Sequence, residues 1–114
     1  MLKIRGTQDI YISRGDTRVI GVNLMTRSLD GDVDYIMTDT EYMVFKLWDK
    51  GFHRELGSIK SEVGTSIINI GSDFTARLNG EYAYSVDLML ADGSKETIIG
   101  QSPNTAPKFV VLEA

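Results

Sequence analysis

The chain has 114 residues, of which 42% are hydrophobic, and a formal net charge of −4. This length fits one domain over residues 1–114, with enough apolar residues for a core that needs no disulfide or metal. The lack of cysteine excludes disulfides and thiolate metal sites. The acidic balance, without a basic stripe, argues against nucleic acid as a partner. No apolar run approaches the length of a secretory signal or a membrane span, so we expect no membrane insertion.

The first forty residues predict two strands and a polar loop. We expect a short strand over 9–12, ended by a turn at 14–16, and a second strand over 17–25, where apolar residues alternate. The turn between them fits either a hairpin or a corner between two sheets. Residues 26–40 are polar and are expected to form a loop, with at most a brief strand at 35–37.

The segment Glu41–Asp49 predicts a strong strand with two largely apolar faces. One face carries Met43, Phe45 and Leu47, and the other carries Tyr42, Val44 and Trp48 together with Lys46. This pattern predicts a central strand, or a strand whose outer face contacts a partner. A weaker strand is expected over 55–60, and a strand rich in β-branched residues over 65–70.

The only helical pattern lies over 72–78. Ser72 or Asp73 is expected to cap it, and Phe74 and Leu78 lie four residues apart on one face. This spacing allows one or two turns of helix and no more.

The clearest strand pattern lies over 80–90, after the corner Leu78-Asn79-Gly80. Tyr82, Tyr84, Val86, Leu88 and Leu90 alternate with more polar residues, as in a half-buried strand. Asp92-Gly93 then predicts a hairpin turn, with 97–99 as the partner strand. A loop over 101–107 and a last strand over 108–112 end the chain.

These elements predict an all-β fold. About seven or eight short strands with one helical turn, and no helix long enough to connect parallel strands, favour an antiparallel β-sandwich. A small β-barrel is the alternative.

Residues that carry chemistry are scarce. His53 is the only histidine and falls in an expected turn, and no serine has a base to activate it, so we expect no catalytic residues and no cofactor. The acidic loop Asp30–Asp39 lacks the spacing of an EF-hand and is expected to be solvated, although its sequence leaves ion binding open. The tripeptide Arg14-Gly15-Asp16 is more typical of a turn than of an adhesion motif. We therefore predict neither an enzyme nor a metal site.

Aromatic residues are the remaining candidates for a site. Tyr42, Trp48, Phe52, Tyr82 and Tyr84 would suit a stacking platform for a sugar or a peptide. Aromatic residues in sandwiches more often belong to the core, which we expect for Tyr82 and Phe45. For Trp48 both interpretations stay open, because the opposite face of its strand already carries the core residues.

The run Leu78-Asn79-Gly80-Glu81-Tyr82-Ala83-Tyr84 resembles the tyrosine corner of immunoglobulin-like sandwiches. The resemblance implies that Gly80 and Tyr82 form a structural corner, with the tyrosine bonded to the upstream main chain. Tyr84 stands where antibody domains place a cysteine, so the likeness is to the architecture and not to antibodies.

The order of several motifs resembles the small immunoglobulin-like modules of tailed-phage tail and baseplate proteins, such as the N-terminal domain of baseplate upper proteins. The motifs that carry it extend over nearly the whole chain: Ile10-Tyr11-Ile12-Ser13-Arg14-Gly15-Asp16-Thr17, Val44-Phe45-Lys46-Leu47-Trp48, Ile67-Ile68-Asn69-Ile70, Gly80-Glu81-Tyr82-Ala83-Tyr84 with Asp92-Gly93, and Lys108-Phe109-Val110-Val111.

This resemblance implies a non-enzymatic structural module of a phage or prophage tail, made in the bacterial cytoplasm and located in the virion. Its partners would be other tail or baseplate proteins, and it could form a homo-oligomer. Candidate interface residues are Tyr42, Trp48, Phe52 and Phe109. The alternative from a different class is a carbohydrate- or cell-surface-binding sandwich that uses Trp48 and Phe52 as its platform.

Overall fold

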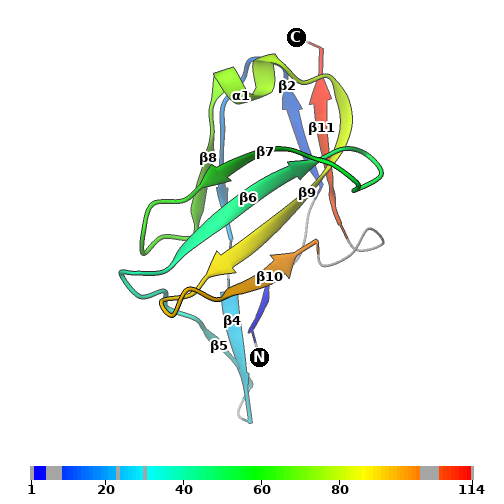
Figure 1. Cartoon of the computed structure of the whole chain (residues 1–114). Coiled ribbons are helices and arrows are strands. Elements are labelled where there is room, and N and C mark those ends of the chain that lie inside the picture. The colour runs from blue at the N-terminus through cyan, green and yellow to red at the C-terminus, as the bar shows by residue number, and fades with distance from the viewer. Residues whose placement is uncertain (1, 5–8, 23, 30, 101–105, 114) are drawn as a thin grey trace.

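The computed structural model describes residues 2–4, 9–22, 24–29, 31–100 and 106–113. Within these residues the chain forms eleven strands and one short helix (Figure 1). In chain order they are β1 (Leu2–Ile4), β2 (Ile10–Ser13), β3 (Arg18–Gly21), β4 (Leu24–Ser28), β5 (Gly31–Asp34), β6 (Tyr42–Trp48), β7 (Glu55–Lys60), β8 (Ile67–Ile70), α1 (Ser72–Ala76), β9 (Gly80–Met89), β10 (Lys95–Ile99) and β11 (Lys108–Leu112).

Six of the strands form the larger sheet, in the order β2-β11-β9-β6-β7, with β10 also paired to β9. The long strand β9 pairs with β6 along one edge, and with β11 and then β10 along the other. Two smaller sheets hold β3-β8 and β1-β4-β5. The pairings are antiparallel except that of β2 with β11. The all-β prediction is confirmed, and these sheets do not close into the alternative barrel.

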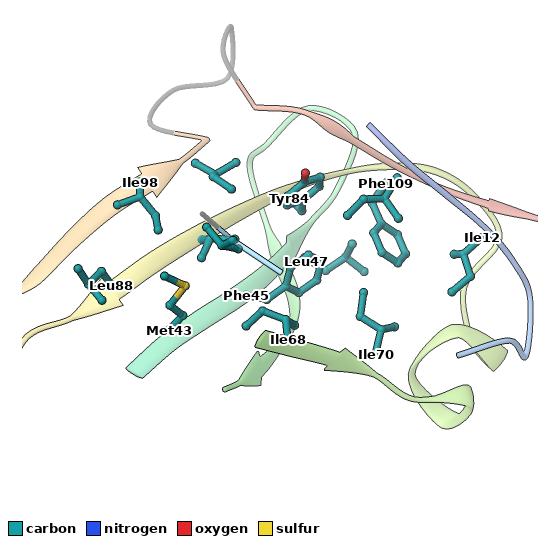
Figure 2. Close-up of a cluster of buried hydrophobic side chains, with 14 of the residues drawn as sticks. Ile12, Met43, Phe45, Leu47, Ile68, Ile70, Tyr84, Leu88, Ile98 and Phe109 are labelled. Carbon is teal, nitrogen blue, oxygen red and sulfur yellow. The ribbon is translucent and has the colours of Figure 1, made fainter. Parts of the chain in front are cut away.

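The core lies between the larger sheet and the β3-β8 pair (Figure 2). Alternate residues of β6 and β9 point into it, as the sequence pattern predicts, and meet Ile68 and Ile70 of β8. The ring of Phe45 stacks on that of Tyr84 at 5.3 Å between centroids and meets the edge of Phe109 at 5.7 Å. Tyr84 is therefore a core residue and belongs to an aromatic cluster with Phe45 and Phe109.

The other face of β9 is buried as well. Ala83, Ser85 and Asp87 expose at most 7% of their surface, so β9 is covered on both sides. The half-buried strand expected from the alternation is therefore wrong. The two-residue period assigns Ala83, Ser85 and Asp87 to the outer face of β9. It does not show that Trp48 and Lys46 of β6 cover this face.

The stretch over 17–25, predicted as one strand, divides into β3 and β4, which join different sheets. The expected loop over 26–40 contains most of the β4-β5 hairpin, which turns at Gly31 with φ of 116°. This hairpin, with β1 paired to its β4 strand, extends to the bottom of Figure 1, away from the larger sheet. Among the side chains of β4 and β5 that the structure describes, only Leu24, at the start of β4, belongs to the core, so the polar sequence that follows shows no apolar alternation from which the strands could be predicted. The patch at 35–37 forms no strand, although Tyr35 and Met37 pack against the core.

Helix α1 is shorter than predicted, and Gly71 is its N-cap, without a side-chain cap bond. The expected cap at Ser72 or Asp73 is therefore wrong. Thr75 connects the helix to the turn at 14–16. This residue is fully buried, and its hydroxyl accepts a bond from the N–H of Gly15 at 3.0 Å and lies 2.9 Å from the carbonyl oxygen of Asp16. The Arg14-Gly15-Asp16 segment is thereby held as a structural turn beside the helix.

Candidate interaction surface on the outer face of the larger sheet

The outer face of the larger sheet is built around the pairing of β6 with β9. The ladder places Val44 opposite Asp87, Lys46 opposite Ser85 and Trp48 opposite Ala83. Because opposite residues of paired strands point to the same side, these side chains share the face away from the core. Most of the candidate residues from the sequence lie on this face or at its border.

Trp48 is fixed onto this face by its ring nitrogen. The Nε1–H donates a hydrogen bond of 2.9 Å to the hydroxyl of Ser85 on β9. The indole stays half-buried, and its ring stacks on Phe52 with centroids 4.6 Å apart and 24° between the planes. Trp48 therefore belongs to a second, smaller hydrophobic layer outside the core, which we call the Trp48-Phe52 stack.

The turn between β6 and β7 holds Phe52 in place. Phe52 has φ of 60°, and among the described residues it is the one non-glycine with positive φ. An L-residue in this left-handed region costs free energy, so the surrounding bonds must impose it. The carbonyl of Asp49 accepts the N–H of Phe52 at 2.9 Å, and its Oδ1 accepts those of His53 and Arg54 at 2.7 and 3.3 Å.

Gly51, which precedes Phe52, has a steric role in this turn. A Cβ at Gly51 would lie 2.7 Å from Nδ1 of His53, so the glycine gives room to the histidine ring. The N–H groups of His53 and Arg54 also lower the pKa of the Asp49 carboxyl, because they favour its charged form. His53 itself is exposed, as the sequence predicts for a turn histidine.

A group of charged side chains, Lys46, Glu55 and Asp87, lies on the same outer face as the Trp48-Phe52 stack. Nζ of Lys46 lies 3.1 Å from Oδ2 of Asp87 and 3.8 Å from Oε1 of Glu55. The hydroxyl of Thr97 donates to Oδ1 of Asp87 at 2.8 Å. Asp87 is almost fully buried, and these contacts supply a partner to each of its carboxylate oxygens. The sequence pattern places Asp87 on the outer face but gives no sign of its burial.

Tyr42 lies at the opposite end of β6 from Trp48. The six residue-to-residue steps from Tyr42 to Trp48 span roughly 20 Å of extended strand. The Tyr42 ring is half-buried and lies 5.8 Å from Nζ of Lys60. The structure thus brings Trp48 and Phe52 together and leaves Tyr42 apart from them.

Phe109 is a correction to the candidate interface. Its side chain is fully buried between Phe45 and Phe74, so it offers no surface to a partner. The sequence placed it on the last strand without showing which way it points. The register of β11 with β9 sets Phe109 opposite Tyr82, whose ring also packs against the core.

At the predicted corner, the Tyr82 hydroxyl is bonded to the main chain of Asn79. It lies 3.0 Å from the carbonyl and 2.9 Å from the N–H of that residue. Gly80, with φ of 91°, makes the sharp change of direction between them. These contacts fix the start of β9 and have no link to the Trp48-Phe52 stack.

The acidic loop Asp30–Asp39 offers no assembled ion site in the part of the chain that the structure describes. Asp34 and Asp39 are exposed, while Asp30 and the side chain of Asp32 lie outside the described residues. Across the described ranges, no three potential metal ligands converge. None of the helical residues described forms a segment with the length and apolar character of a membrane span.

No protein-family model, curated protein or solved structure matches the chain. The features that bear on its function are therefore those of its own residues, above all the Trp48-Phe52 stack.

Proposed function

We propose that this chain is a non-enzymatic structural or assembly module of a phage or prophage tail, made in the bacterial cytoplasm and carried in the virion. It acts through contacts with other tail or baseplate proteins, and its fold is an immunoglobulin-like sandwich. Two features support the fold: the parallel pairing of β2 with β11 beside antiparallel β9, and the bond of Tyr82 to the main chain of Asn79. The order of sequence motifs supports the tail assignment.

The observation that carries the proposed mode of action is the Trp48-Phe52 stack. The core is complete without it, since the opposite faces of β6 and β9 already enclose Phe45, Leu47 and Tyr84. The turn nevertheless places Phe52 in a strained backbone conformation that holds its ring over Trp48. Strain of this kind persists where a fixed side-chain position is useful, and tryptophan is enriched at the centres of protein interfaces.

The carbohydrate-binding alternative receives less support from the same geometry. A sugar platform needs an aromatic ring with an open face. One face of the Trp48 indole is covered by Phe52, and its ring nitrogen is bonded to Ser85, which leaves less of the indole for a sugar to stack on. The partly exposed surface of Trp48 and Phe52 is better suited to contact with a protein that packs around the edge of the stack.

The test is a binding experiment with defined partners. Tail and baseplate proteins encoded beside this chain are purified and mixed with it singly, and complexes are detected by size-exclusion chromatography with light scattering. We expect a complex with at least one of them, lost in Trp48→Ala and retained in Ile36→Ala, a change at an exposed apolar residue after β5. A glycan array run in parallel with both variants addresses the alternative. Binding of a glycan that depends on Trp48, without any tail-protein complex, would overturn the proposal.

A further inference from the structure

The strand β8 forms an unusual edge of the smaller sheet. It pairs with β3 on one side, and no strand of the described residues pairs with its other side. The segment from 63 to 72, which includes β8, contains no charged residue and no proline. Folded proteins normally protect such edges with charges, prolines or bulges, because an unpaired strand edge recruits other strands.

The main-chain groups along this edge are free to pair. Val22 donates to the carbonyl of Ser66 at 3.0 Å, which fixes the alternation of the ladder between β3 and β8. By that alternation the N–H and C=O groups of Ile68 face β3, and those of Ile67 and Asn69 face away from it. Within the described ranges, no hydrogen bond reaches the main chain of Ile67 or Asn69 from that outer side.

The other edge strands carry charges or are bridged by a charged side chain; β1 carries Lys3, and β5 carries Asp32 and Asp34. Nη1 of Arg18 binds the carbonyl of Tyr11 at 3.2 Å, so a charged side chain bridges the edges of β3 and β2. The edge strand β10 carries Lys95 and Glu96 and has a register shift before Ile99, and β7 carries a charge at each end. An edge without charges or proline therefore distinguishes β8 from these other edge strands.

We propose that β8 pairs with β8 of a second copy of this chain, antiparallel and about a two-fold axis at Ile68. This register sets Ile67 opposite Asn69 of the second copy, and Asn69 opposite Ile67. The two residues whose main-chain groups face outward thereby bond to each other, and the two β3-β8 pairs become one four-stranded sheet. The uncharged segment from 63 to 72 brings no like charges together, although the chain as a whole is acidic.

Side-chain exposure on the same sheet supports a second copy. Ile67 is 45% exposed and Val19 is 65% exposed, and both point away from the core. In the four-stranded sheet Ile67 lies beside Asn69 of the other copy and diagonal to its Ile67, so it loses contact with water. This surface is on the smaller sheet, separate from the Trp48-Phe52 stack, and the inference does not depend on the proposed function.

The first test measures the self-association of the full chain by sedimentation equilibrium, up to about 1 mM protein. We expect a reversible dimer that Ile67→Lys weakens by at least about tenfold in Kd. The matched control is Val33→Lys, which adds the same charge at an exposed β-branched residue of another edge strand and should leave the dimer unchanged. A monomer at every concentration, or a dimer that persists in Ile67→Lys and disappears in Trp48→Ala, would overturn the inference.

The second test determines the register. The chain has no cysteine, so Ile67→Cys and Asn69→Cys can each be made as the single thiol of the protein. Directly opposite positions lie close enough for a disulfide, whereas the diagonal 67–67 and 69–69 pairs are about 7–8 Å apart. An oxidised equimolar mixture should therefore give mixed dimers well above the half expected by chance. A random distribution, or an excess of like pairs, contradicts this register, and circular dichroism verifies that both variants are folded.

Discussion

Phe52 lies over Trp48 with a ring separation of 4.6 Å, although its own φ of 60° is unfavourable for any residue but glycine. The two residues are joined by a turn in which Asp49 accepts bonds from three successive main-chain N–H groups. The stack outside the core is therefore maintained at a cost in backbone free energy.

The first prediction separates the backbone of Phe52 from its ring. Phe52→Ala and Phe52→Gly both remove the stack, but only glycine relieves the left-handed conformation. We expect Phe52→Gly to be more stable than Phe52→Ala by roughly 1 kcal/mol, measured by urea unfolding. An alanine variant as stable as the glycine variant would show that the turn imposes no strain.

The second prediction concerns the ion pair of Lys46 with Asp87. Lys46→Met leaves the Asp87 carboxylate buried with Thr97 as its remaining short-range partner, and we expect a loss of about 2 kcal/mol in unfolding free energy. The double variant Lys46→Met/Asp87→Leu should recover most of that loss, because no uncompensated charge remains. A double variant less stable than Lys46→Met alone would contradict this explanation of the site.

The third prediction is the acid sensitivity of the connection before β6. The Glu41 carboxylate is 4% exposed, accepts the N–H of Thr38 at 3.0 Å, and has both oxygens 2.8 Å from the Tyr35 hydroxyl. The bond from the Thr38 main chain, with that from Tyr35, lowers the pKa of Glu41 below its ordinary value of 4.5, against the opposing effect of burial. A lowered folded pKa stabilises the fold above the unfolded pKa, and this contribution is lost as pH falls through the folded value.

Stability of the wild-type chain should therefore fall as pH is lowered below about 4, and Glu41→Gln should show a shallower fall from a less stable state at pH 7. Denaturant unfolding at a series of pH values measures both slopes. Parallel curves for the two proteins would show that Glu41 does not contribute. Asp49 and Asp92, whose pKa values are also lowered by hydrogen bonds, contribute to the pH dependence that stays in the variant.

The fourth prediction concerns the corner at the start of β9. Tyr82→Phe removes both bonds to Asn79 and should cost about 1 kcal/mol in unfolding free energy. Tyr11→Phe removes an exposed hydroxyl of the same type and should change stability by less than about 0.5 kcal/mol. Equal effects of the two substitutions would show that the corner does not stabilise the fold.

The sequence predicts strands well where a two-residue period meets a core. The alternation in β9, the two apolar faces of β6 and the β-branched run of β8 all correspond to observed strands. The hairpin turn at Asp92-Gly93 is also confirmed, since Gly93 has φ of 88° and donates to the carbonyl of Leu90. In each case the local pattern predicts the strand or the turn, although the burial of both faces of β9 goes beyond what its alternation indicates.

The missed features depend on contacts between distant residues. The β4-β5 hairpin has no apolar period to reveal it, and the burial of Ser85 and Asp87 comes from Trp48 and Lys46 on a neighbouring strand. The burial of Phe109 follows from its place between two other aromatic rings. The stacking of Trp48 on Phe52 depends on the left-handed conformation of Phe52, and phenylalanine is not a residue type that predicts this conformation.

The role of the Trp48-Phe52 stack is tested by the affinity of the chain for a tail or baseplate protein that binds it, measured by titration calorimetry with the wild type and Phe52→Ala. If the Trp48-Phe52 stack is the contact surface, Phe52→Ala should raise Kd by at least about thirtyfold, as truncation of an interface anchor does, while Ile36→Ala leaves Kd unchanged. The same Kd for the wild type and Phe52→Ala, with both proteins folded, would contradict the assignment of this surface.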